Sequence, residues 1–268
     1  MGPDQIRNVV LVGHGGSGKT ALAEALAHTA GLTTRLGRIE DGNTITDFEP
    51  EEIDRESSVA LALAPLEWSG HKINIIDTPG YADFLGEVLA ALRAADLALF
   101  VVSAVDGVEV QTEAVWRLAE QEGIARAVFV NKLDRERSSH SRTLAQLKET
   151  FGTGIAPLQV PIGAEHDLKG VANLVGGEAY LYEGSPQGTK TDVPEEAQGL
   201  VDELHTSLVE AVVETDDELL EKYFEGEEPS GEQLIAGMHA GMVDGTAFPV
   251  LCGSATQLIG IDRLAEFI

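Results

Sequence analysis

The sequence has one cysteine, few basic residues and no long apolar run. The single cysteine, Cys252, excludes an internal disulfide framework and is typical of a protein from a reducing cytoplasm. No run of about 18 apolar residues indicates a membrane span. The first ten residues also lack the charged-then-apolar pattern of a secretion signal. We therefore expect a cytoplasmic globular protein without a membrane partner.

Basic residues are scarce: 18 Lys and Arg stand against 45 Asp and Glu, which gives a formal net charge of −27. Extended binding to nucleic acid depends on basic side chains that neutralise phosphates, so this balance disfavours it. We expect no sequence-specific nucleic-acid partner, and we expect the isolated domain to be a monomer. A well-solvated surface is the simplest cause of the acidic excess.

Short apolar segments alternate with segments of helical spacing. Continuous apolar strands separated by helices predict a mainly parallel sheet that is covered on both faces. Residues 59–68 predict a further strand, antiparallel because only Ser69-Gly70 joins it to the next one. The predicted fold is therefore α/β with a six-stranded sheet. The other strands are expected at 8–12, 73–77, 97–102, 127–131 and 248–252, and helices at 19–30, 83–95 and 111–122.

The alternation stops after about residue 157 and resumes only at Phe248. We interpret residues 158–247 as an α+β insertion before the last strand of the domain formed by 1–157 and 248–268. The alternative, a separate C-terminal domain, would leave the strand at 248–252 without a sheet. Within the insertion a loop is predicted at 184–194 and helical patterns at 195–224 and 231–242.

The segment GHGGSGKT, residues 13–20, matches the phosphate-loop pattern and lies between a predicted strand and a predicted helix. Its backbone N–H groups can surround phosphates, Lys19 can reach the β- and γ-phosphates, and the Thr20 hydroxyl can bind Mg²⁺. The start of the helix adds partial positive charge. The alternative is a glycine-rich turn that binds nothing.

Two further motifs follow strands in the order expected of a nucleotide-binding protein. DTPG begins with Asp77, a candidate Mg²⁺ ligand, and ends with Gly80, whose N–H can meet the γ-phosphate. Asp77 alone could equally be a helix cap. NKLD ends with Asp134, whose carboxylate can accept hydrogen bonds from guanine N1–H and the 2-amino group, a donor pair that adenine lacks.

Taken together, the phosphate loop, DTPG, NKLD and GSA (253–255) mark a guanine-nucleotide-binding GTPase. The protein resembles the bacterial translation elongation factor G family over essentially the whole sequence. The resemblance is carried by the segments HKINIIDTPGYADF, AVFVNKLDR, QVPIGAEHDLKGV and FPVLCGSA. Proteins of that family are much longer, so the sequence corresponds to their GTPase portion with its inserted subdomain. The resemblance implies GTP-driven translocation or a related ribosomal step, with the large-subunit factor-binding region and stalk protein as partners.

The motifs and the resemblance assign a role to each site residue. Catalysis is expected of Lys19, Gly80 and Tyr81, and Mg²⁺ ligation of Thr20, Ser58 and Asp77. Contact with GTP or GDP is expected of Gly13, His14, Gly15, Gly16, Ser17, Gly18, Lys19, Thr20, Asp77, Thr78, Pro79, Gly80, Tyr81, Asn131, Lys132, Leu133, Asp134, Ser254 and Ala255.

Three departures from the family lie at the expected nucleotide site and suggest a specialised paralogue. Gly16 and Ser17 stand where the family usually has aspartate and alanine, and Ser58 stands where it has the threonine that binds Mg²⁺. Tyr81 replaces a histidine that helps to position the attacking water. A phenol stays neutral at pH 7, whereas an imidazole beside a phosphate can become charged.

These departures leave three functional hypotheses. The first is a ribosome-associated GTPase with slow intrinsic turnover. The second is a guanine-nucleotide switch that hydrolyses GTP poorly, and the third is a ribosomal protection or release factor. In each case we expect the γ-phosphate and Mg²⁺ to order residues 36–60. The acidic insertion is either a solvated face or a docking surface for a basic ribosomal protein.

Overall fold

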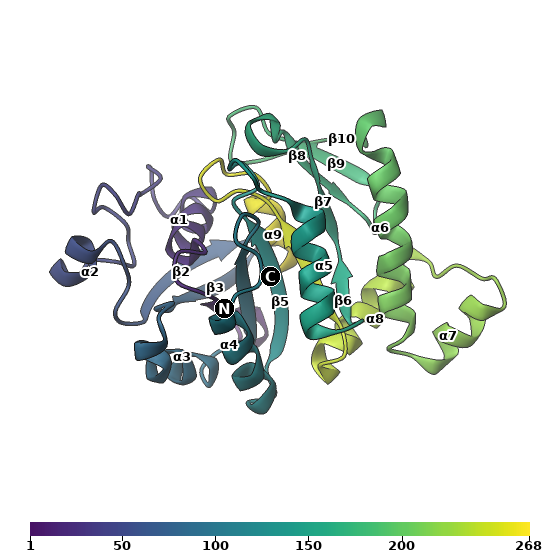
Figure 1. Cartoon of the computed structure of the whole chain (residues 1–268), viewed down its shortest axis with the longest axis horizontal. Helices are drawn as coiled ribbons and strands as arrows, with labels where there is room; N and C mark the ends of the chain where they lie inside the picture. The colour runs from purple at the N-terminus through teal and green to yellow at the C-terminus, as the bar shows by residue number, and fades with distance from the viewer.

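A seven-stranded sheet forms the centre of the molecule, and the computed structural model describes all 268 residues (Figure 1). Its order is β2-β3-β1-β4-β5-β11-β6, and every neighbouring pair is parallel except β2 with β3. The predicted α/β fold, its five parallel strands and the antiparallel edge strand are confirmed. The strands are β1 (Ile6–Val12), β2 (Ala62–Trp68), β3 (His71–Asp77), β4 (Leu97–Ser103), β5 (Ala125–Asn131), β6 (Ile155–Pro157) and β11 (Phe248–Cys252).

The sheet has one strand more than the six predicted. The additional strand, β6, is only three residues long and pairs in parallel with the first part of β11. Three residues are too few to produce a recognisable period in the sequence. Pairing with β11, which lies about 90 positions further along the chain, therefore decides their conformation.

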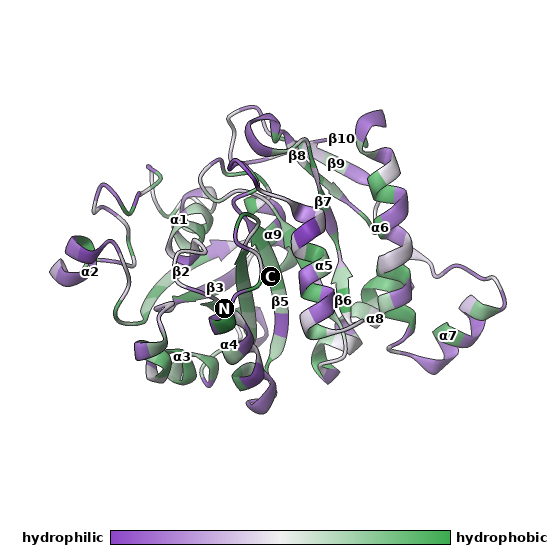
Figure 2. Cartoon of the chain, viewed as in Figure 1, coloured by the Kyte–Doolittle hydropathy of each residue, from purple (hydrophilic) through white to green (hydrophobic).

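The central strands are apolar throughout because helices cover both of their faces. Val9 and Leu11 of β1 belong to one core cluster, whereas Val10 and Val12 belong to another on the opposite face. Figure 2 shows the resulting hydrophobic colour along the central strands. None of the helices is long and apolar enough to cross a membrane. Helices α1 (Lys19–Thr29) and α9 (Ile261–Phe267) cover the first face, and α3 (Leu85–Leu92), α4 (Val110–Gln121) and α5 (His140–Phe151) cover the second.

A second, antiparallel sheet follows β6 in the chain and has the order β10-β9-β8-β7. Helix α6 packs on both β6 and β7, and buried residues of this region share one core cluster with the second face of the main sheet. The region is therefore packed against the main sheet rather than tethered to it. Its elements are β7 (Gln159–Ile162), β8 (Gly170–Asn173), β9 (Glu178–Leu181), β10 (Thr189–Asp192), α6 (Glu195–Val213), α7 (Asp217–Phe224) and α8 (Gly231–Asp244).

One local prediction in this region was wrong. The segment 184–194, predicted as a loop, contains β10, an exposed edge strand whose residues Thr189–Asp192 are polar and carry no apolar alternation. The predicted helical pattern at 195–224 is confirmed as two helices, because Asp216 accepts hydrogen bonds from the N–H groups of Glu218 and Leu219 and so begins a new helix. The region also holds the short strands β7, β8 and β9, which the sequence pattern did not indicate.

An aromatic cluster packs at β11, where the chain returns to the main sheet. The Trp116 ring stacks on Phe151 at a centroid distance of 4.0 Å and meets the edge of Phe248 at 4.9 Å. The Arg126 guanidinium lies 4.5 Å from the Phe248 ring centre. These contacts join α4, α5, β5 and β11, and so they fix the strand that carries the GSA motif.

His140, at the start of α5, is buried and neither of its ring nitrogens has a hydrogen-bond partner. Burial lowers its pKa from the ordinary 6.5 to about 4. The unfolded chain therefore binds a proton more readily than the folded one between those two pH values. Stability is complete above about pH 6.5 and decreases as the pH falls toward 4.

We predict that His140→Leu removes this part of the acid sensitivity. Near pH 7.5 the free energy of unfolding should change little, because no hydrogen bond is lost. At pH 5.0 the variant should be more stable than the parent by about 2 kcal/mol. Urea denaturation at both pH values measures this difference, with exposed His239→Gln as the control. The same pH dependence in the parent and in His140→Leu would contradict the assignment.

Candidate functional site

Four loops meet at one edge of the main sheet, where its parallel strands end. The loop 13–18 follows β1, DTPG follows β3, NKLD follows β5 and GSA follows β11. Parallel strands present their carboxyl ends on the same edge, so motifs that are far apart in the sequence become neighbours. Ligands of open α/β sheets bind at this edge.

The loop 13–18 depends on glycine at positions where a side chain would collide or strain the backbone. Gly13 and Gly18 both have positive φ, and a Cβ on either would lie 2.5 Å from another atom. For Gly18 that atom is the amide nitrogen of Asn131. The loop is thus closed tightly enough to present its backbone to a ligand. Helix α1 begins directly after it, at Lys19.

Lys19 is 6% exposed, and its ammonium donates to the carbonyl oxygens of Gly13 and His14 at 3.1 and 3.0 Å. Burial lowers the pKa of Lys19 to about 8, and the nearby carboxylates Asp77 and Asp47 partly oppose this. An anionic ligand beside the ammonium would favour its charged form further. The position therefore fits a phosphate.

Hydroxyl and carboxylate oxygens converge beside Lys19. The Thr20 and Ser58 hydroxyls are 3.1 Å apart, and the Ser58 hydroxyl also donates to Asp47 Oδ1 at 2.7 Å. Burial raises the pKa of Asp77 to about 6, and the nearby Thr20 hydroxyl and Lys19 ammonium partly offset the rise. Two buried carboxylate oxygens, Asp77 Oδ1 and Asp47 Oδ2, have no hydrogen-bond partner.

This oxygen set fits Mg²⁺. Magnesium prefers oxygen ligands and keeps several waters, so it is held by one or two carboxylates and hydroxyls rather than by a dedicated cage. No group of three or more His, Cys, Asp or Glu side chains is arranged for a metal anywhere in the structure. The candidate Mg²⁺ site is therefore the place where the unpartnered carboxylate oxygens lie. Its residues are Thr20, Ser58, Asp77 and Asp47. From the sequence we expect the first three as Mg²⁺ ligands, which stays a prediction, but not Asp47, which lies in an acidic stretch without any motif.

The turn after β3 presses against the phosphate loop. A Cβ on Gly80 would lie 2.5 Å from the Lys19 ammonium nitrogen and 2.6 Å from Gly15 Cα, so only glycine fits. The Thr78 hydroxyl donates to Leu11 O at 2.7 Å and fixes the turn to β1. Tyr81 is 52% exposed, and its ring lies over Gly15, where a Cβ would meet ring atoms at 3.3 Å. The tyrosine therefore stands at the rim of the phosphate loop, next to Gly80.

His14 turns away from this centre. Its Nε2 lies 3.1 Å from Glu109 Oε2 at the start of α4, and its Nδ1 is buried without a partner. The side chain links the phosphate loop to α4, while its carbonyl accepts from Lys19.

Asn131 ties three loops together. Its amide donates to Ser17 O at 3.1 Å and accepts from the Ala255 N–H at 3.0 Å. The Lys132 ammonium donates to Gly16 O, and the Leu133 N–H donates to Gly253 O at 3.3 Å. The residues of NKLD thus connect the phosphate loop with GSA. The Ala255 N–H points to Asn131 here, so the expected contact of Ala255 with GTP or GDP stays a prediction.

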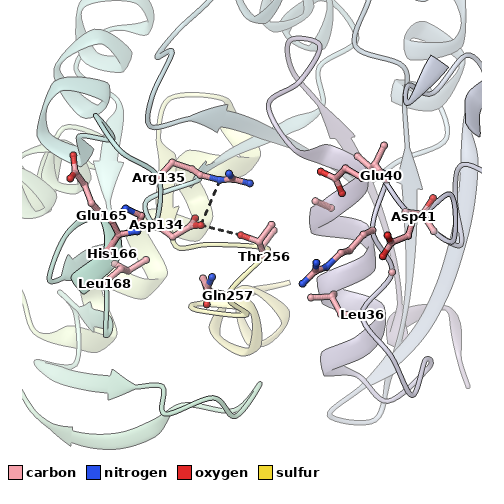
Figure 3. Close-up of a pocket in the computed structure, with 16 residues that line it drawn as sticks. Leu36, Glu40, Asp41, Asp134, Arg135, Glu165, His166, Leu168, Thr256 and Gln257 are labelled. Carbon is pink, nitrogen blue, oxygen red and sulfur yellow. Dashed lines mark hydrogen bonds and ion pairs between the residues drawn. The ribbon is translucent and has the colours of Figure 1, made fainter. Parts of the chain in front are cut away.

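Asp134 faces a cavity of about 580 Å³ (Figure 3). Its carboxylate accepts from the hydroxyls of Ser254 at 2.7 Å and Thr256 at 3.2 Å, which fixes its orientation. Figure 3 shows Asp134, Arg135, Thr256 and Gln257 on one side, and Leu36, Glu40 and Asp41 on the other. The cavity thus extends from the NKLD loop to the segment before α2 (Pro50–Arg55).

The second sheet region also reaches this cavity. Glu165 and His166, between β7 and β8, lie beside Asp134 in Figure 3. Glu165 accepts from the Arg137 N–H at 2.7 Å, and His166 lies 3.6 Å from Glu136. Sequence reasoning gave neither residue a role, although both lie in QVPIGAEHDLKGV, because the contact joins segments about 30 positions apart.

Comparisons with known proteins agree with the geometry. The family described as Elongation factor Tu GTP binding domain matches residues 4–268. A crystal structure of a protein from Thermus thermophilus has a TM-score of 0.91 and 42% sequence identity. The match covers 98% of this chain and 40% of the Thermus chain, so the chain spans well under half the length of that relative. The chain belongs to the Elongation factor Tu GTP binding domain family, whose members bind guanine nucleotides.

Proposed function

We propose that the protein binds GTP and GDP with Mg²⁺ at the carboxyl edge of the main sheet and hydrolyses GTP. The observation that carries the proposal is the hydrogen-bonding of Asn131 to both Ser17 and Ala255, which joins the phosphate loop to the base-reading loops. A single ligand that contacts both loops has a phosphate end and a base end. In this family that ligand is a guanine nucleotide.

Each end of the nucleotide has a proposed set of contacts. The N–H groups of the loop 13–18 and the ammonium of Lys19 bind the phosphates. Thr20, Ser58 and Asp77 hold Mg²⁺, which when bound neutralises charge on the β- and γ-phosphates. Asp134 reads the guanine donors, and the Lys132 stem lies along the base.

Hydrolysis requires a water molecule placed in line with the γ-phosphate. Gly80 packs closely against Lys19, and its N–H is proposed to contact the γ-phosphate. Tyr81 stands at the same rim with an exposed ring, and its hydroxyl is proposed to hold the water by hydrogen bonding. A neutral phenol can orient water but cannot supply a cation, so we propose slow intrinsic turnover.

We further propose that GTP hydrolysis drives or regulates a ribosomal step such as translocation. This rests on the resemblance to elongation factor G, which implies contact with the large-subunit factor-binding region and stalk protein. Residues 1–157 and 248–268 would form the GTP-binding domain, and 158–247 the inserted acidic subdomain. A ribosomal role assigns the activity to the cytoplasm, with the isolated domain as a monomer.

A second candidate is a guanine-nucleotide switch with little hydrolysis. Tyr81 favours it, because the family histidine that helps to position water is absent from this position. A ribosomal protection or release factor is a related candidate that shares this domain. Turnover of GTP separates the first candidate from the switch.

We predict that Asp134→Asn weakens GTP binding at least tenfold and improves binding of xanthosine triphosphate. The asparagine amide opposes the guanine 2-amino group but can donate to the oxygen that xanthine carries there. Titration calorimetry with both nucleotides measures the exchange, and exposed Asp192→Asn is the matched control. Unchanged GTP affinity in Asp134→Asn, or tighter binding of ATP than of GTP by the parent, would overturn the guanine assignment.

We predict that Tyr81→Phe lowers GTP turnover of the full-length protein by ~10²-fold or more while GTP affinity stays the same, because the hydroxyl acts on the water and not on the nucleotide. Tyr81→His should increase stimulation by ribosomes. Phosphate release with and without ribosomes measures both. Full ribosomal stimulation in Tyr81→Phe would refute the role of the hydroxyl, and no turnover by the parent in either condition would favour the switch.

A further inference from the structure

Thr46 lies outside every motif, yet its side chain meets the DTPG carboxylate. It is 1% exposed, and its hydroxyl donates to Asp77 Oδ2 at 2.9 Å. Asp77 is also 1% exposed, and its other oxygen, Oδ1, has no partner. A carboxylate with one oxygen bound in this way cannot rotate freely, so Thr46 determines where Oδ1 points.

The backbone around Thr46 is held by the helix that follows the phosphate loop. Glu24 of α1 is buried and accepts hydrogen bonds from the N–H groups of Ile45 and Gly37. Thr20 and Glu24 stand four positions apart, on the same face of α1. One face of this helix thus carries a candidate Mg²⁺ ligand and the anchor of the segment that contains Thr46.

The residues on either side of Thr46 are also fixed. The Asp47 N–H donates to the Thr44 hydroxyl at 3.3 Å, and that hydroxyl donates to Asp47 O. These two bonds close a turn. Asp47 in turn accepts from Ser58. Thr46 therefore contacts Asp77 from a hydrogen-bonded turn.

We propose that Thr46 is a positioning residue for Mg²⁺, which orients Asp77 and links the segment 37–47 to the metal. The inference rests on the proposed function, because it requires nucleotide binding that depends on Mg²⁺. Thr46 itself touches neither metal nor nucleotide. Partners of this kind, one step removed from the metal, typically change metal affinity by about 10–100-fold when they are lost.

The test compares Thr46→Val with Thr46→Ser in the full-length protein. Valine keeps the branched shape but leaves Asp77 Oδ2 without its donor, whereas serine keeps the hydroxyl. The quantity measured is the Mg²⁺ midpoint, which is the Mg²⁺ concentration at which the slowing of GDP release by Mg²⁺ is half complete. We expect Thr46→Val to raise this midpoint about tenfold or more. Thr46→Ser should stay within about threefold of the parent. In EDTA, GDP affinity of Thr46→Val should match the parent within about twofold, because the phosphate and base contacts remain.

A matched control is Thr29→Val on α1, because Thr29 is buried and its hydroxyl has no partner. It should change neither the Mg²⁺ midpoint nor the affinity in EDTA. If Thr46→Val does not fold, as judged by its thermal melt, Thr46→Ala removes the same hydroxyl and serves in its place.

The outcomes are distinguishable. An unchanged Mg²⁺ midpoint, or an equal loss of affinity with Mg²⁺ and with EDTA, would overturn the positioning role and leave the proposed function intact. A parent protein that binds no guanine nucleotide, or binds it equally with Mg²⁺ and EDTA, would overturn the proposed function itself.

Discussion

One buried ammonium facing two buried carboxylates is the constraint on which the site depends. Lys19 lies close enough to Asp77 and Asp47 for their charges to raise its pKa, although burial lowers it more. Leaving a buried polar atom unpaired costs about 1–3 kcal/mol, and one oxygen of each carboxylate is unpaired. The fold bears this cost at the end of its central strands. A phosphate beside the ammonium and a divalent cation beside the carboxylates would relieve both halves at once, which supports the proposal that nucleotide and Mg²⁺ bind here together.

Hydrogen bonds between the loops that follow different strands hold these loops around this centre. Asn131 is held at both ends of its amide, and the carboxylate of Asp134 is held by two hydroxyls. A base-reading carboxylate in a fixed orientation discriminates better than a mobile one, because the wrong base leaves it unpaired. The same bonds connect the base end to the phosphate end through Ser17.

The sequence predicted the parts of the site that are contiguous and follow apolar strands. Lys19, Asp77 and Asp134 each stand in a motif at a strand end, and parallel strands bring such ends together. Thr46, Asp47 and Glu165 could not be found in this way. No pattern in their segments assigns these three residues a role, and long-range hydrogen bonds bring them to the site. The same holds for β6 to β10, since strands of three or four residues take their conformation from their partners rather than from a pattern.

Two of the three departures from the elongation factor G family, Gly16 and Tyr81, lie in or over the phosphate loop. Gly16 has a positive φ with open space around it, and Tyr81 covers the bare Cα of its neighbour Gly15. These changes replace the family's aspartate and histidine, so neither a carboxylate nor an imidazole stands at these two positions where the γ-phosphate is expected. On the opposite, metal-binding side the acidic groups remain, with Asp77 and Asp47 buried and Ser58 keeping the hydroxyl that the family places there. In the proposed function, the groups expected to hold Mg²⁺ and the nucleotide are thus retained, while the family groups expected to act on the attacking water are changed. Nucleotide binding and hydrolysis would then depend on different residues.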